Sequence, residues 1–169
     1  MLRLLLCILV LCLAPLSFSV AQPPSISAQT SFLDSSVIKM PIAKNVSMDE
    51  SIDSMKLRAN ALNMKLVAHQ PLSEELKVRG EKNVRRLEIF QFCEPKIAQE
   101  MVKFNMSFAA YLPCRITLVE DEHGQAWLVM MNLDVLINSI ILPPPLQELA
   151  IKVRDNLKKI MDAGVHGEL

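Results

Sequence analysis

Two cysteines in the middle of the chain, each close to a proline, are the residues best suited to chemistry. They occur in the segments FCEP, residues 92–95, and LPCR, residues 112–115. Cysteine thiolates bind soft metal ions and attack disulfides. Pro95 is typical of a first helical turn, so Cys93 is expected at or beside a helix N-terminus. Because the positive end of a helix dipole favours an anion, we expect Cys93 to be a more reactive thiol than Cys114.

Three roles are open to this pair. If the two cysteine-bearing segments pair in one sheet, the sulfurs could together hold a soft metal such as copper, or a sulfur-containing small molecule. They could instead form a structural disulfide, whose loop of about 20 residues would contribute roughly 3 kcal/mol. They could also be buried, inert thiols. The candidate ligand or redox site comprises Cys93, Glu94, Pro95, Pro113 and Cys114, with Cys93 and Cys114 as candidate metal ligands.

The remaining residues give little support for an enzyme. His69, His123 and His166 do not have the spacing of a zinc site, and each is expected at the surface. No P-loop, G-x-S-x-G, H-E-x-x-H or Cys-x-x-Cys signature is present. The missing Cys-x-x-Cys weighs against thiol-disulfide exchange, the alternative enzymatic function. The sequence favours a binding or carrier module, and a purely structural, homodimeric domain is the further alternative.

The hydrophobic pattern predicts the elements that must position this pair. Ser47 and Glu50 have capping-box spacing, so a helix is expected from Ser47 to about Asn63. Strands are expected over 65–69 and 87–92, and a helix over 94–104. Further strands at 115–120 and 125–133 would be joined by a turn containing Gly124, and a long helix after residues 143–145 would end at Gly164. This mixture predicts an α+β fold, with amphipathic helices on one face of a mostly antiparallel sheet.

The order of these segments resembles the "domain of unknown function 302" family. The similarity extends from about Ser47 to Gly164 and rests on FCEP, on LPCR and on the acidic turn EDEHG, residues 120–124. The resemblance implies a small α+β domain, plausibly a homodimer, without an assigned activity or cofactor.

The first 21 residues predict export. Arg3 precedes an apolar run from Leu4 to Leu16, and Ser19-Val20-Ala21 resembles a signal-peptidase site. The run is too short for a stable membrane anchor. Cleavage after Ala21 would give a periplasmic or extracellular protein in which Cys93 and Cys114 are the remaining cysteines. We expect a flexible linker at 22–36, a domain at 37–164 and a tail at 165–169.

Charge gives no partner. The chain has 18 basic and 18 acidic residues and no basic stripe. We therefore expect no binding to nucleic acid.

Overall fold

A five-stranded sheet and the helices around it make up residues 26–168, the part of the chain that the computed structural model describes. The predicted leader, residues 1–21, lies outside the described residues. The helices are α1 (Ile26–Ser36), α2 (Met48–Ala61), α3 (Leu72–Val78), α4 (Pro95–Phe104), the 3₁₀ helix η1 (Met106–Tyr111), α5 (Leu133–Ser139) and α6 (Pro144–His166). The strands are β1 (Val37–Pro41), β2 (Lys65–Gln70), β3 (Leu87–Cys93), β4 (Cys114–Glu120) and β5 (Ala126–Met131).

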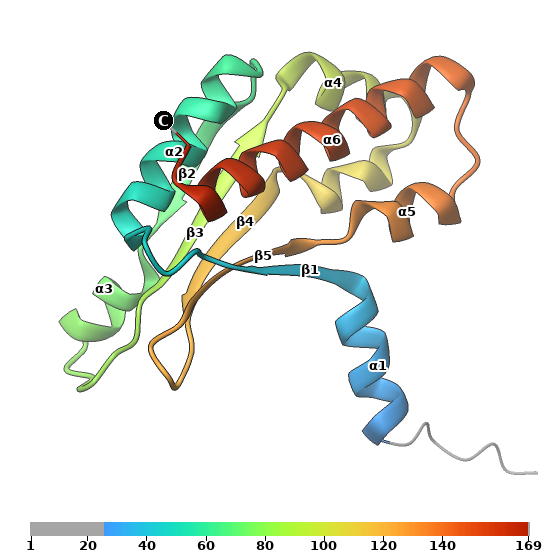
Figure 1. Cartoon of the computed structure of the whole chain (residues 1–169). Helices are drawn as coiled ribbons and strands as arrows, with labels where there is room; N and C mark the ends of the chain where they lie inside the picture. Colours follow the sequence, from blue (N-terminus) through green and yellow to red (C-terminus); the bar gives the residue numbers. More distant parts are fainter. Residues whose placement is uncertain (1–25, 169) are drawn as a thin grey trace, which may run out of the picture.

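The sheet has the strand order β1-β5-β4-β3-β2, and every neighbouring pair is antiparallel. Strand β3 alternates strictly between half-buried and buried side chains, and β4 and β5 bury every second residue over most of their length. This alternation is expected of a sheet that packs one face on a core. Figure 1 shows α2, α4 and α6 on the same side of the sheet. The predicted α+β class, with a mostly antiparallel sheet, is confirmed.

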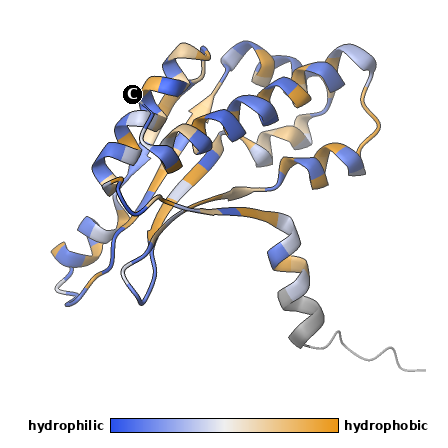
Figure 2. Ribbon diagram, in the orientation of Figure 1, coloured by the Kyte–Doolittle hydropathy of each residue, from blue (hydrophilic) through white to orange (hydrophobic). Residues whose placement is uncertain are grey.

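The core lies between that sheet face and the helices α2 and α6. Phe90, Phe92, Ile116, Leu118 and Leu128 point from the strands into it and are inaccessible to solvent. The outer sides of α2 and α6 are largely hydrophilic (Figure 2). The predicted capping box is also confirmed. Ser47 Oγ accepts from the Glu50 backbone N–H, and the Glu50 carboxylate accepts from the Ser47 N–H.

A glycine allows α6 to approach α2 and the sheet closely. At Gly164, a Cβ atom would lie 2.6 Å from Met55 Cγ and 2.8 Å from Leu128 Cδ1. Both neighbours are fully buried, so they have little room to move. Any side chain larger than hydrogen would therefore push α6 away from the core.

One carboxylate is buried in this core and is fully paired. Glu88 accepts hydrogen bonds from His69 Nε2, at 2.6 Å, and from Arg86 Nε. Arg86 also donates to Asp49 at the start of α2. Burial acts to raise the pKa of Glu88, but the hydrogen bonds from Arg86 and His69 outweigh it and the pKa is lowered. The network joins α2 to β2 and β3.

The structure differs from the sequence-based expectation at several elements. The long helix continues past Gly164 to His166 and is capped by Gly167 in the left-handed conformation, with φ 67°. The predicted strand at 125–133 ends at Met131, and α5 follows after Asn132, whose side chain accepts from the Asp134 N–H. Helix α1 occupies most of the segment expected to be a flexible linker.

Gly124 has φ 79°, as the predicted hairpin turn requires.

Replacing Gly164 by alanine tests the close approach. We expect Gly164→Ala to lower the free energy of unfolding by about 1–3 kcal/mol, because the added methyl group overpacks the junction of α2, α6 and β5. Urea unfolding followed by circular dichroism measures this difference. Lys159→Ala, at an exposed position of the same helix, is the control and should change stability by less than about 0.5 kcal/mol. A Gly164→Ala protein as stable as the control would contradict the packing described here.

Candidate functional site

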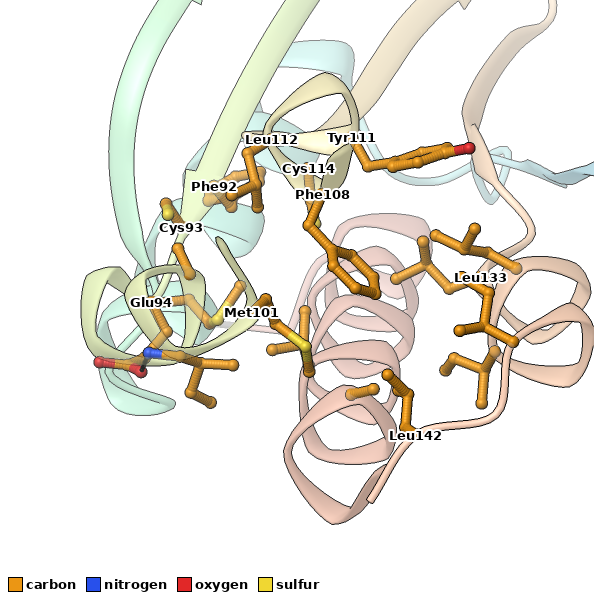
Figure 3. Close-up of a pocket in the computed structure, with 18 residues that line it drawn as sticks. Phe92, Cys93, Glu94, Met101, Phe108, Tyr111, Leu112, Cys114, Leu133 and Leu142 are labelled. Atoms are coloured by element: carbon orange, nitrogen blue, oxygen red, sulfur yellow. Dashed lines mark hydrogen bonds between the residues drawn. The ribbon is translucent and has the colours of Figure 1, made fainter. Parts of the chain in front are cut away.

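An apolar cavity of about 80 Å³ lies where the sheet meets α4, η1, α5 and α6. Its lining comes from the end of β3, the start of β4 and all four helices. Figure 3 shows Phe92, Met101, Phe108, Leu133 and Leu142 arranged around it. Among the lining residues only Cys93, Glu94, Cys114 and Tyr111 carry a polar or titratable side chain.

Helix α4 forms one wall of this cavity because of how it starts. Glu94 is the N-cap residue, and its carboxylate accepts from the backbone N–H groups of Lys96 and Ile97, the latter at 2.7 Å. Pro95 occupies the first helical turn, as the sequence predicted. The apolar stripe of the helix then buries Ile97 and Met101 on the cavity side. The capping site of the helix is therefore taken by Glu94.

Strand pairing brings Cys93 and Cys114 together, but one residue out of register. The Cα partner of Cys114 is Phe92, and Cys93 is the next residue along β3. Because successive strand side chains point to opposite faces, Cys114 shares the helix-covered face with Phe92. Cys93 is the last residue of β3, where the chain turns into α4. Both cysteines line the cavity as half-buried free thiols, and Figure 3 places Cys93 beside Phe92 and Glu94, and Cys114 nearer Phe108.

The surroundings disfavour the thiolate form of both cysteines. Burial, with a smaller contribution from the Cys93 sulfur, raises the pKa of Cys114 to about 11. Burial and the neighbouring Glu94 carboxylate also raise the pKa of Cys93. This direction is the opposite of the sequence-based expectation that the helix N-terminus activates Cys93. The apolar wall removes water that would solvate the anion, and the nearby negative charge of Glu94 adds to this effect.

The predicted site residues are thus divided between two regions. Cys93, Glu94 and Cys114 line the cavity. Pro95 only starts α4. Pro113 lies outside the cavity and lines a neighbouring hollow instead.

The model of the family described as "Domain of unknown function DUF302" matches residues 38–164. The chain belongs to the DUF302 family. The resemblance seen in the FCEP, LPCR and acidic-turn segments is thereby confirmed.

A solved structure has the same fold as this DUF302 chain. It is the crystal structure of an uncharacterized conserved DUF302 protein from Bacillus stearothermophilus, with a TM-score of 0.63 and 18% sequence identity. The similarity covers 75% of this chain and 96% of that one. At this identity the likeness establishes the fold alone. No curated protein matches the chain.

Sequence reasoning missed most of the cavity in this DUF302 domain. Met64 and Met101 bring two more sulfur-bearing side chains to its wall. Phe108 and Tyr111 come from η1, a helix that was not predicted. The available signal was the apolar composition of the segments after residue 104 and after residue 132, both of which lie beside predicted elements.

Two other features of the described residues bear on function. Asp162, His166 and Glu168 each offer a ligand atom, and these atoms lie within 4.8 Å of one another. All three side chains are exposed, and Glu168 is paired with Arg58 at 2.8 Å.

None of the helices described over residues 26–168 combines the length and the apolar character needed to cross a bilayer.

The raised thiol pKa values predict how labelling depends on pH. Only the thiolate reacts, so the rate of Cys114 modification by iodoacetamide should rise about tenfold per pH unit from 7 to 10, since its pKa is about 11. Mass spectrometry of Cys93→Ser and Cys114→Ser proteins would assign each rate to one sulfur. A Cys114 rate that levels off below pH 9 would contradict the environment described here.

Proposed function

We propose that this DUF302 domain is a binding or carrier module that takes a small apolar or sulfur-containing group into the cavity beside Cys114. The single observation that supports this most strongly is the cavity itself. It is lined almost entirely by apolar side chains, yet two thiols and two thioethers contribute to its wall. Thiols and thioethers are polarizable and weakly hydrogen-bonding, so they suit a soft, apolar guest better than a charged one.

The size of the cavity limits the guest. A dry protein cavity of about 150 Å³ admits benzene or xenon. The cavity here, at about 80 Å³, is roughly half as large. It suits xenon, a short alkyl group or a small thioether, and a ring would require its walls to move.

The thiols act here as neutral contacts. Their raised pKa values keep them protonated near pH 7. Since disulfide exchange starts from a thiolate, this protonation weighs against the redox alternative. The offset between Cys93 and Cys114 in the strand register weighs against it as well.

Filling the cavity tests the proposal. Xenon or dimethyl sulfide should shift the NMR signals of the Met64 and Met101 methyl groups, because both line the cavity. Ala98→Leu places three extra carbon atoms on the cavity wall and should abolish these shifts. Ala61→Leu, at an exposed position of α2, is the matched control and should bind like the original protein. Shifts that are absent in the original protein, or that persist in Ala98→Leu, would count against the cavity as the site.

A soft metal ion is the second candidate guest, because four sulfur-bearing side chains surround one cavity. Thiolates and thioethers together favour Cu(I). Binding would have to displace the thiol proton of Cys114, so affinity should rise with pH.

Competition with a chromophoric Cu(I) chelator tests this second candidate. We expect one Cu(I) per chain, with affinity reduced at least tenfold in Cys114→Ser and in Met101→Leu. Met161→Leu is the control, since Met161 is buried away from this cavity. Binding that survives loss of Cys114 would exclude the cavity as the copper site and would leave the apolar-guest proposal intact.

A further inference from the structure

A second, larger hollow adjoins the cavity and shares part of its wall. It has a volume of about 540 Å³ and lies beside α1, α5 and the ends of β4 and β5. Four residues line both spaces, namely Tyr111, Cys114, Leu133 and Leu136. The inner cavity and the outer hollow therefore adjoin one another at these four residues. A ligand that parts these side chains could occupy both spaces at once.

The two spaces differ in chemical character. The inner cavity is apolar, whereas the outer hollow also presents Arg115, Thr117 and Asn132. Arg115 is the single charged residue among those that line the hollow. Asn132 already accepts from the Asp134 N–H and donates to the Ser35 carbonyl. Its side chain is therefore committed to the protein.

Arg115 has no such commitment. Among the described residues its guanidinium group makes no hydrogen bond and no ion pair, and its side chain is exposed. Arg58, Arg86 and Arg154 each pair with a carboxylate. Arg79 and Arg85 are exposed and unpaired among the described residues, as Arg115 is, but they line neither space. A guanidinium in an otherwise uncharged hollow is well suited to hold a carboxylate or phosphate, because its planar fork can donate two parallel hydrogen bonds.

From this juxtaposition we propose that the ligand is an anionic amphiphile. Its headgroup binds Arg115 in the outer hollow, and its unbranched apolar tail passes between Tyr111 and Leu136 so that the end of the tail enters the inner cavity beside Cys114. This inference rests on the proposed function, since it assigns a ligand class to the same cavity. The charge selects the headgroup, and the cavity selects a narrow tail.

A series of single-chain ligands tests the two ends separately. Calorimetric titration with butanoate, hexanoate and octanoate should show affinity rising about fourfold per added methylene until the inner cavity is full. Octanoate and octyl phosphate, which represent the two kinds of headgroup, should bind more tightly than octanol. Octyltrimethylammonium should bind most weakly. Higher salt should weaken only the anionic ligands.

Two variants locate the binding groups. Arg115→Gln should lower octanoate affinity at least tenfold while leaving octanol unchanged. Arg85→Gln is the matched control, because Arg85 is also exposed and forms no ion pair among the described residues but lies outside the outer hollow. Leu136→Trp should block the tail of every octyl ligand by enlarging a side chain of the shared wall. Its thermal unfolding transition would establish that the variant is folded.

Each outcome separates this inference from the proposed function. Equal affinities for octanoate, octanol and octyltrimethylammonium, or an Arg115→Gln protein that binds octanoate normally, would overturn the headgroup assignment. Xenon binding without any octyl binding would overturn the amphiphile and leave the small apolar guest. Failure of both xenon and octanoate would overturn the two proposals together. Tail binding that survives Leu136→Trp would exclude the route through the shared wall.

Discussion

The close contact of α6 with α2 and β5 at Gly164 is the constraint on which the rest of the structure depends. Near its C-terminus the helix is held against the fully buried Met55 and Leu128. With 23 residues, α6 extends for about 34 Å. Its N-terminal half supplies Ala150 and Val153 to the inner cavity. A contact near one end of a rigid helix therefore sets the position of a cavity wall near the other.

The same packing explains the electrostatics of the cysteines. Because α4, η1 and α6 close over the ends of β3 and β4, little water reaches Cys114, and this burial raises the pKa of its thiol to about 11. Burial also raises the pKa of Cys93, and the helix-capping carboxylate of Glu94 beside it acts in the same direction. Glu94, the N-cap residue of α4, thus also contributes to keeping the Cys93 thiol neutral. The backbone N–H groups at the start of α4 donate to the Glu94 carboxylate.

Local signals in the sequence identified the elements that carry their own instructions. The Ser47–Glu50 capping box, the turn at Gly124 and the proline-started helix at Pro95 each depend on residues a few positions apart. The predicted end of α6 was wrong because a glycine often follows the last residue of a helix, whereas Gly164 lies within α6 and packs against Met55 of α2. Helix α5 was missed because its apolar residues follow β5 almost directly and continue its pattern. Cys93, Glu94 and Cys114 were predicted together, but the rest of the cavity was not, since its wall combines side chains from β3, β4 and four helices.

The cavity itself argues against a purely structural role for this region. Protein cores are packed as densely as organic crystals. The cavity of about 80 Å³ is a local departure from that density. A single larger side chain at Ala98 or Ala150, both of which line the cavity, would fill much of it. The small residues there are explained if a ligand supplies the missing contacts, and Cys114, which packs as a small apolar side chain, is compatible with the cavity both with and without that ligand.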